Sequence, residues 1–230
     1  MKNSYVWAVL GVIVFFTPFF LFDSVYNVYN QWNTVNPISL AFLKFAILAT
    51  FGEVLGLRIK TGKYIVSGFG LLPRAIIWGF YGMWIAAAMG IFRSGVPAFM
   101  DKFAVFHGMA EAMGGGFSAM KLLGAFFISV MMNTSFAPVF MTLHKITDTH
   151  IVNHEGKVSC LWKPIPVKKI ITTLNWDVQW NFVFKKTIPL FWIPAHTLTF
   201  ILPTNFQVLF AAILGVVLGL ILSIAVIKSK

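Results

Sequence analysis

Six stretches of this chain are apolar over lengths that reach or approach the thickness of a lipid bilayer. A transmembrane helix needs about 20 such residues, with a range of about 17–25. Because backbone groups in hydrocarbon must form their hydrogen bonds within the protein, helices are the expected form. We therefore predict an all-α, polytopic transmembrane helix bundle of about six spans. The predicted spans are Val6–Phe22, Ile38–Leu57, Tyr64–Phe92, Leu122–Leu143, Ile188–Pro203 and Phe206–Ile227.

The composition agrees with a membrane protein and excludes a soluble one. Charged residues make up 11% of the chain, whereas soluble globular domains carry about 25%. That share is too small to cover a soluble particle of this size, so soluble enzymes are excluded. The net charge of +11 does not predict a nucleic-acid partner, because Lys and Arg in such a chain first mark topology. The expected partner is the lipid bilayer.

The basic residues are distributed unevenly over the loops between the predicted spans. Of the 18 Lys and Arg residues, thirteen fall on one predicted side and three, Arg93, Lys102 and Lys121, on the other. Loops on the cytoplasmic side of a membrane collect positive charge, so we predict that both termini lie on the same, positive side. An odd number of spans would mix the two groups.

Residues 1–37 are predicted to form an N-terminal anchor helix followed by a polar loop. The apolar run after Lys2 resembles a signal peptide, but no small-x-small cleavage site follows Phe22. We therefore expect an uncleaved anchor. Residues 38–230 then form the membrane core, and a hydrophilic loop on the positive side covers about residues 144–187.

Two segments outside the spans carry aromatic patterns. Pro97–Met113 has Phe and Met side chains at helical spacing and predicts an interfacial helix that ends at glycines 114–116. Near the end of the hydrophilic loop, Trp176, Trp180 and Phe184 recur every four residues. This stripe is typical of the aromatic belt at a membrane surface; stacking on a ligand is the alternative interpretation.

Three charged side chains lie inside predicted spans, namely Lys44, Glu53 and Arg74. A charge at the centre of a bilayer costs at least about 2.5–3.5 kcal/mol, so such residues are candidates for function. From the helical rise, Glu53 and Arg74 differ in depth by roughly 7–8 Å, and we predict an ion pair between them. The pair either fixes helix packing or lines a polar pathway. Lys44 either extends outward toward the membrane surface or lines the same pathway.

The fourth predicted span is interrupted by three polar residues, Asn133, Thr134 and Ser135, shortly before Pro138. Proline frees a backbone carbonyl, so we predict a local helix break, which is tolerated where it faces protein or a watery cavity. Either these groups share a polar interior with those of the fifth span, or they form hydrogen bonds between helices. The polar residues at comparable depth in the fifth span are His196, Thr197 and Thr199.

Small residues recur at four-residue spacing in two of the spans. Gly52 and Gly56 lie on either side of Glu53, and Gly215 and Gly219 repeat the pattern in the last span. Without side chains at these positions, a second backbone can approach closely. The pattern predicts tight helix packing and indicates no particular activity.

A metal site is the main alternative for the polar side chains of the hydrophilic loop. His150 and His154 have a spacing suited to one helix face, with Asp148 and Glu155 beside them. The segment lacks a helical hydrophobic period, however, and the chain has one cysteine, Cys160. We therefore interpret these residues as solvated loop residues and expect neither a metal nor another cofactor. Without a nucleophile motif or a phosphate-binding loop, no enzyme activity is predicted.

Several motifs of the later spans form a recognisable set. Residues 192–195 read WIPA, residues 200–211 read FILPTNFQVLFA, and residues 136–140 of an earlier span read FAPVF. Over about residues 40–225, the chain resembles the Mpv/PMP family of small peroxisomal and mitochondrial membrane proteins. The residues that carry the resemblance most directly are Phe136, Ala137, Pro138, Trp192, Pro194, Pro203 and Phe206.

The chain also departs from the family pattern. Gln207 stands in place of the usual Arg, Leu218 and Gly219 stand in place of a Trp-Asn pair, and an additional span precedes the usual four helices. The resemblance implies an integral protein of an organelle membrane, mitochondrial inner or peroxisomal, or of a bacterial inner membrane. It also implies channel-like behaviour towards small metabolites, as in some members of the family.

Two functional hypotheses remain from the sequence. The first is a channel or conduit for small solutes, with Lys44 and Arg74 favouring anions. The second is a structural or accessory subunit of a larger membrane complex, whose partners are copies of this chain or other membrane subunits. The intramembrane polar residues that are candidates for a pathway are Lys44, Glu53, Arg74, Asn133, Thr134, Ser135, His196 and Gln207.

Overall fold

The computed structural model describes residue 14, residues 17–18 and residues 21–228, with side chains as far as residue 221. The described part is 83% helix and contains no strand, so the predicted all-α fold class is confirmed. In chain order the elements are α2 (Asp23–Val35), α3 (Pro37–Thr61), α4 (Leu71–Met100), η1 (Ala104–Phe106), α5 (Met109–Ala112), α6 (Ala119–Asn153), η2 (Val158–Trp162), α7 (Val167–Thr173), α8 (Trp176–Val178), η3 (Gln179–Trp192), α9 (Ile193–Ile201) and α10 (Thr204–Lys228).

Four helices of the described part are long and apolar enough to cross a membrane. They are α3, α4, α6 and α10, the last counted over Thr204–Ile221. Predicted spans two, three, four and six correspond to these helices. The first predicted span, Val6–Phe22, lies largely outside the described residues. The fifth corresponds to the end of η3, a π-helix, and to α9, neither of which is among the four.

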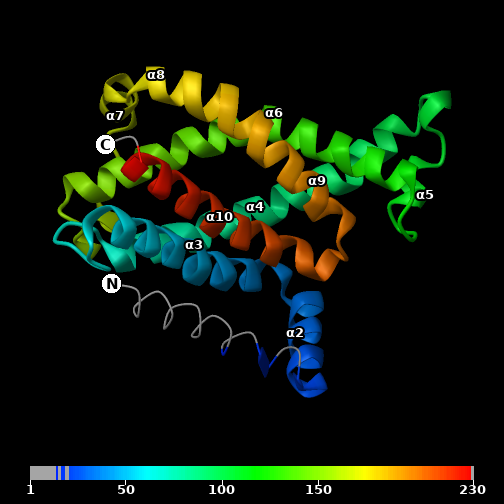
Figure 1. The fold of residues 1–230 in the computed structure, drawn as a ribbon, viewed down its shortest axis with the longest axis horizontal. Coiled ribbons are helices and arrows are strands. Elements are labelled where there is room, and N and C mark those ends of the chain that lie inside the picture. The colour runs from blue at the N-terminus through cyan, green and yellow to red at the C-terminus, as the bar shows by residue number, and fades with distance from the viewer. Residues whose placement is uncertain (1–13, 15–16, 19–20, 229–230) are drawn as a thin grey trace.

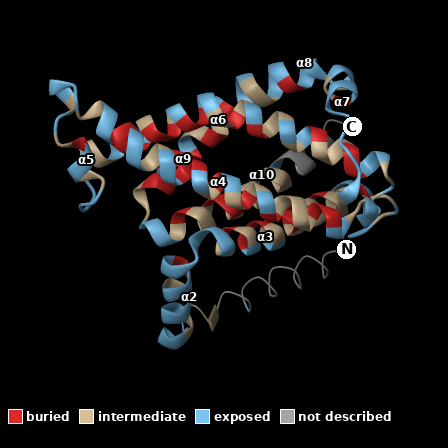
Figure 2. Ribbon diagram, turned by 180° about the vertical axis from the view of Figure 1, so that it is seen from behind, coloured by how far each residue is buried: buried red, intermediate tan, exposed pale blue. Residues whose placement is uncertain are grey.

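The long helices run side by side along one axis, and α2 projects away from their end (Figure 1). α3 packs along α4 and α10, while α6 packs against α4 and α9. Buried positions gather where these helices face one another, and the outer faces are exposed (Figure 2). The core contains Phe45, Met89, Ile128 and Phe200, one from each of α3, α4, α6 and α9.

Local sequence explains where the long helices begin and end. α3 begins with Pro37, which suits a first helical turn, and ends at Thr61; Gly62 follows it with a φ of 78°, the left-handed conformation common after a helix C-terminus. α6 begins after Ser118, whose side chain accepts a hydrogen bond from the Lys121 backbone N–H at 3.1 Å. Such a cap satisfies one of the free donors of the first turn.

Glycines allow the closest approach between helices at two contacts, α3–α10 and α3–α4. The first involves Gly52, as predicted. A Cβ placed on Gly52 would lie 3.0 Å from Val216 Cα, which locates the α3–α10 contact. The tightest α3–α4 contact was not predicted: a Cβ on Gly82 would lie 2.5 Å from the Ala41 carbonyl oxygen. Gly215 does not belong to a close contact, since its added Cβ would meet no atom within 4 Å.

Two segments outside the predicted spans have a different secondary structure from the one predicted. Residues 23–35, expected within a polar loop, form α2. The predicted interfacial helix over Pro97–Met113 is wrong, because α4 ends at Met100 and only short helices follow. The Asp101 carboxylate accepts a hydrogen bond from the Met109 backbone N–H at 2.9 Å, and Gly108 has a φ of 84°, so the chain turns back on itself there.

The predicted break in the fourth span is also wrong, because α6 runs without interruption through Pro138. Thr134 and Ser135 donate hydrogen bonds to the carbonyls of Val130 and Met131, at 2.8 and 2.5 Å, within the same helix. Their polarity is therefore satisfied without opening the backbone. α6 continues to Asn153, so the first ten residues of the predicted hydrophilic loop are helical.

Candidate functional site

A cavity of about 490 Å³ lies inside the bundle. Its walls come from α3, α4, α6, α10 and the η3–α9 segment, and most of its lining side chains are apolar. The lining residues are Phe45, Ala49, Gly52, Glu53, Gly56, Leu57, Lys60, Phe69, Arg74, Trp78, Ile85, Met132, Asn133, Phe136, Ala137, Phe140, Met141, His144, Asp148, Trp192, His196, Ala211, Gly215, Leu218 and Gly219.

The cavity has two polar ends separated by an apolar middle. At the charged end it reaches Arg74, in the first turn of α4, and Lys60, an exposed residue in the last turn of α3. The deep end lies near the middle of the helices, at Ile85 of α4 and at Asn133 of α6. The cavity therefore extends from one end of the bundle to about half its length.

Arg74 is the centre of the charged end. Its Nη1 lies 2.8 Å from Glu53 Oε2 of α3, which confirms the predicted pair, and it also forms an ion pair with Asp148 of α6. Its Nε donates to the Phe69 carbonyl oxygen at 2.6 Å. The guanidinium thus holds α3, α4 and α6 together, and its positive charge is offset by two carboxylates.

Glu53 has further partners that the sequence did not indicate. Its Oε1 accepts a hydrogen bond from Trp78 Nε1 at 3.0 Å and lies 3.4 Å from His144 Nε2. The Trp78 and His144 rings also pack together, with centroids 4.6 Å apart. A carboxylate with this many donors is held in one position, so Glu53 is a fixed part of the wall.

At the deep end, a hydrogen-bond network joins α6 to α9. Ser129 Oγ donates to the Ile193 carbonyl oxygen at 2.7 Å, and Asn133 Nδ2 donates to the Ser129 carbonyl oxygen at 2.8 Å. His196 Nδ1 lies 3.0 Å from Asn133 Nδ2 and 3.2 Å from Asn133 Oδ1, so the two side chains pair across the helices. Nδ1 accepts from the amide nitrogen in one imidazole tautomer and donates to the amide oxygen in the other.

Trp192 places an N–H group beside His196. The two rings stack with their centroids 5.0 Å apart. Trp192 is 9% exposed, and its buried Nε1 has no hydrogen-bond partner among the described residues. An unsatisfied buried donor costs about 1–3 kcal/mol. The deep end therefore has more hydrogen-bond donors than the protein itself pairs.

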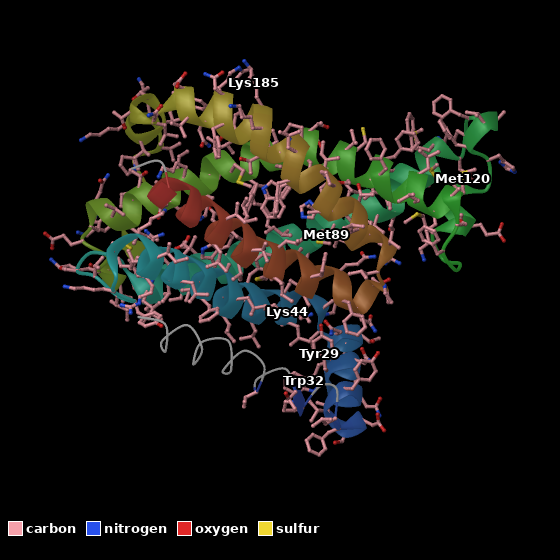
Figure 3. The ribbon with its side chains drawn as sticks, in the orientation of Figure 1. Tyr29, Trp32, Lys44, Met89, Met120 and Lys185 are labelled. Atoms are coloured by element: carbon pink, nitrogen blue, oxygen red, sulfur yellow. The ribbon has the colours of Figure 1, made fainter. Side chains whose placement is uncertain are left out.

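Four of the predicted pathway residues lie outside the cavity lining, and Lys44 and Gln207 are two of them. Lys44 does not line the cavity: its Nζ donates to Asn33 Oδ1 of α2 at 2.6 Å and lies 4.9 Å from the Tyr29 ring centroid (Figure 3). The side chain extends toward the N-terminal end of α3, as helix geometry favours. Gln207 is buried and donates to the Leu202 carbonyl oxygen at 2.8 Å, so it stabilises the α9–α10 turn.

The hydroxyl groups of the predicted polar Thr and Ser residues donate hydrogen bonds to backbone carbonyls of their own helices. Thr134 and Ser135 are exposed on α6 and lie outside the cavity lining. Thr197 and Thr199 donate to the carbonyls of Ile193 and Ala195, at 2.8 and 2.9 Å, within their own helix. Of the predicted polar interior, Asn133 and His196 are the pair that the structure brings together across helices.

The seven residues that resemble family motifs have different positions in the structure. Phe136, Ala137 and Trp192 line the cavity. Pro194 and Pro203 shape the backbone instead, Pro194 in the first turn of α9 and Pro203 between α9 and α10. The remaining two are Pro138, inside α6, and Phe206, whose ring stacks on Tyr26 and Tyr29 of α2 at 6.1 and 6.3 Å between centroids.

The interpretation of the hydrophilic-loop residues as solvated is wrong for two of them. His150 is buried, and its Nε2 lies 3.0 Å from the Cys160 carbonyl oxygen. Asp148 is part of the charged end. The prediction failed because α6 extends further than its apolar stretch. Within the described part of the chain, no three His, Cys, Asp or Glu side chains are grouped in a way that could hold a metal ion.

Sequence reasoning missed Phe140 and His144 as cavity residues and placed Asp148 in a solvated loop, although one signal would have revealed them. With Asn133 and Ala137, they recur at three- or four-residue intervals on α6, which is the spacing of a single helix face. The stripe is visible in the sequence only if the helix is continued beyond its apolar part.

Comparison with protein-family models, with curated proteins and with solved structures finds no match to this chain. The cavity holds apolar walls between two polar ends, an arrangement suited to holding a small molecule.

Proposed function

We propose that this protein is a conduit for small solutes across the membrane in which it resides. The observation that carries the proposal is the cavity, which extends from the charged end of the bundle to the middle of the helices. Its volume of about 490 Å³ falls within the roughly 300–1,000 Å³ typical of small-molecule sites. A solute that enters at Lys60 and Arg74 would reach the deep end at His196.

The charges of the cavity favour uncharged solutes over anions. Arg74 is offset by Glu53 and Asp148, and Lys44 lies outside the lining. The positive field that the sequence suggested for an anion pathway is therefore largely cancelled. Beyond the exposed Lys60 at the mouth, an anion would leave water for apolar walls without a free cation to compensate it.

The resemblance to the Mpv/PMP family supports the same proposal, since channel-like behaviour is what that resemblance implies. We propose on this basis that the chain belongs to an organelle membrane or to a bacterial inner membrane. The charge-rich end of the bundle would face the cytoplasm-like side.

Swelling of proteoliposomes tests the conduit directly. Vesicles containing the protein are placed in isotonic xylitol, an uncharged probe, or in isotonic potassium gluconate with valinomycin, an anionic one. We expect light scattering to report swelling in xylitol well above that of empty vesicles, and little in gluconate. An unchanged barrier to both probes would contradict the proposal.

Two matched glycine variants show whether any flux passes through the cavity. Gly215 lines the cavity and Gly90 lies on the exposed face of α4, and an added Cβ at either would meet no atom within 4 Å. Gly215→Leu should reduce xylitol flux at least several-fold by filling the cavity, whereas Gly90→Leu should leave it unchanged. Equal flux in the two variants would place the pathway elsewhere.

The alternative is a structural or accessory subunit of a membrane complex. The broad exposed apolar surface favours it, with Phe80, Ile91 and Leu190 between 58% and 74% exposed, although lipid covers such surfaces in any membrane protein. Tight vesicles together with stoichiometric co-purification of another membrane protein would select this alternative.

A further inference from the structure

The deep end of the cavity combines features that specify a ligand more narrowly than a conduit does. We propose that it binds an uncharged, largely apolar molecule, and that a carbonyl-type oxygen of this molecule accepts a hydrogen bond from Trp192, beside His196. The inference rests on the proposed conduit, for which it names the class of solute.

The unpaired donor is the indole N–H of Trp192. Trp192 lines the cavity and is 9% exposed, and its Nε1 is buried without a partner among the described residues. Its ring stacks on His196, which pairs with Asn133 and also lines the cavity. A buried donor without an acceptor favours a ligand that supplies an acceptor oxygen.

The walls define the rest of the ligand. Between the two polar ends, the lining is made by aromatic and aliphatic side chains, among them Phe45, Phe136 and Met132. These surfaces favour an apolar or aromatic body. Arg74 is paired with Glu53 and Asp148, and Lys60 lies at the exposed mouth of the cavity, so the deep end offers no charged side chain to an ionic ligand.

Photolabelling with benzophenone tests this assignment in proteoliposomes. Benzophenone is an uncharged ketone with two aromatic rings, and on irradiation its carbonyl adds across a neighbouring C–H bond. Mass spectrometry of peptides then locates the label. We expect saturable labelling of cavity residues, with Met132 and Met141 as the favoured positions, and several-fold less labelling in Gly215→Leu than in Gly90→Leu.

Competition experiments distinguish recognition of the acceptor oxygen from recognition of the apolar body of the ligand. Fluorenone and fluorene have nearly the same shape, but only fluorenone carries a carbonyl. Fluorenone should suppress the label at lower concentration than fluorene. Trp192→Phe keeps an aromatic ring without the donor and should reduce that advantage by roughly three- to tenfold, the effect of one hydrogen bond. The matched Trp180→Phe, at an exposed position of η3, should leave it unchanged.

Three results would overturn the inference. These are label confined to residues that face lipid, equal competition by fluorene and fluorenone, and an unchanged fluorenone advantage in Trp192→Phe. If any of them occurs while xylitol flux persists, the conduit stands and this ligand class is wrong. If flux is absent but cavity labelling and the ketone preference hold, the binding site stands without a conduit.

Discussion

Arg74 shows how a buried charge is tolerated inside this bundle. Its side chain is 9% exposed and contacts carboxylates from two other helices, while its Nε bonds a backbone carbonyl. Removing such a group destabilises the folded protein mainly because each carboxylate would be left with an uncompensated charge. Asn133 and His196 illustrate the neutral counterpart at the deep end, where hydrogen bonds alone compensate the loss of water.

Replacing Arg74 by Ala should therefore destabilise the protein by about 3–5 kcal/mol, as for other broken buried ion pairs. Thermal unfolding in detergent, followed by size-exclusion chromatography, measures the effect as a lower Tm. Adding Asp148→Asn to Arg74→Ala should restore part of the loss, since one of the unpaired charges is removed. A double variant less stable than Arg74→Ala would contradict this account of the network.

Cys160 should react slowly with maleimides at neutral pH. The thiol is 1% exposed, and burial raises its pKa above the ordinary value. Less of the reactive thiolate is then present near pH 7, so the alkylation rate should keep rising at pH values where an ordinary thiol has already reached its maximum. Mass spectrometry against time measures it. In a Cys160→Ser background, Ser159→Cys at the exposed neighbouring position should react much faster at pH 7.

At the scale of the elements, the helices are placed by small residues and by hydrogen bonds that cross between them. Gly82 of α4 lets this helix approach the backbone of α3 at Ala41. Gly52 of α3 lets Val216 of α10 approach α3 closely. α6 is joined to α4 through Asp148 and to α9 through Ser129. The cavity is the space left between these two sets of contacts.

Gly82→Ala should destabilise the α3–α4 contact, because its Cβ would lie 2.5 Å from a backbone oxygen that has little freedom to move. We expect a loss of about 1–3 kcal/mol from overpacking. Gly90→Ala is the control: it meets no atom within 4 Å and should be neutral or stabilising by up to about 1 kcal/mol. Thermal unfolding of the two variants side by side gives the comparison, and equal Tm values would contradict it.

At the scale of the whole molecule, the loops of opposite ends differ in charge. α3 ends, α4 begins and α6 ends at the end of the bundle that carries Lys60 and Lys145. The segment between α6 and η3, which contains η2, α7 and α8, lies at this same end (Figure 1). The opposite end carries the glycine-rich segment between α5 and α6.

Single cysteines at the two ends should therefore label from opposite sides of a membrane. In a Cys160→Ser background, Lys168→Cys and Phe117→Cys introduce exposed positions in α7 and before α6. Because positive loops stay inside, a membrane-impermeant maleimide added to intact cells should label Phe117→Cys and leave Lys168→Cys unmodified. Inverted vesicles should give the reverse pattern. Labelling of both positions from one side would contradict the assigned orientation.

The sequence by itself determined the helical membrane character, most of the predicted spans that the structure describes, and the pairing of Glu53 with Arg74. These follow from hydropathy and from depth along a helix, both of which are local quantities. It also selected Asn133 and His196, because a polar group in an apolar stretch must find a partner.

Only the tertiary structure decided which polar residues meet and where space remains. Lys44 and Gln207 lie in spans like Arg74 but bond to residues near the end of the bundle away from Arg74, since rotation about the helix axis and neighbouring elements determine which partner is in reach. Asp148 and His144 joined the site because α6 continues past its apolar stretch. Gly52, Gly215 and Gly219 all line the cavity, but an added Cβ would meet a neighbouring helix at Gly52 and Gly219 and no atom within 4 Å at Gly215. The two glycine pairs have the same four-residue spacing in the sequence, so packing alone distinguishes these positions.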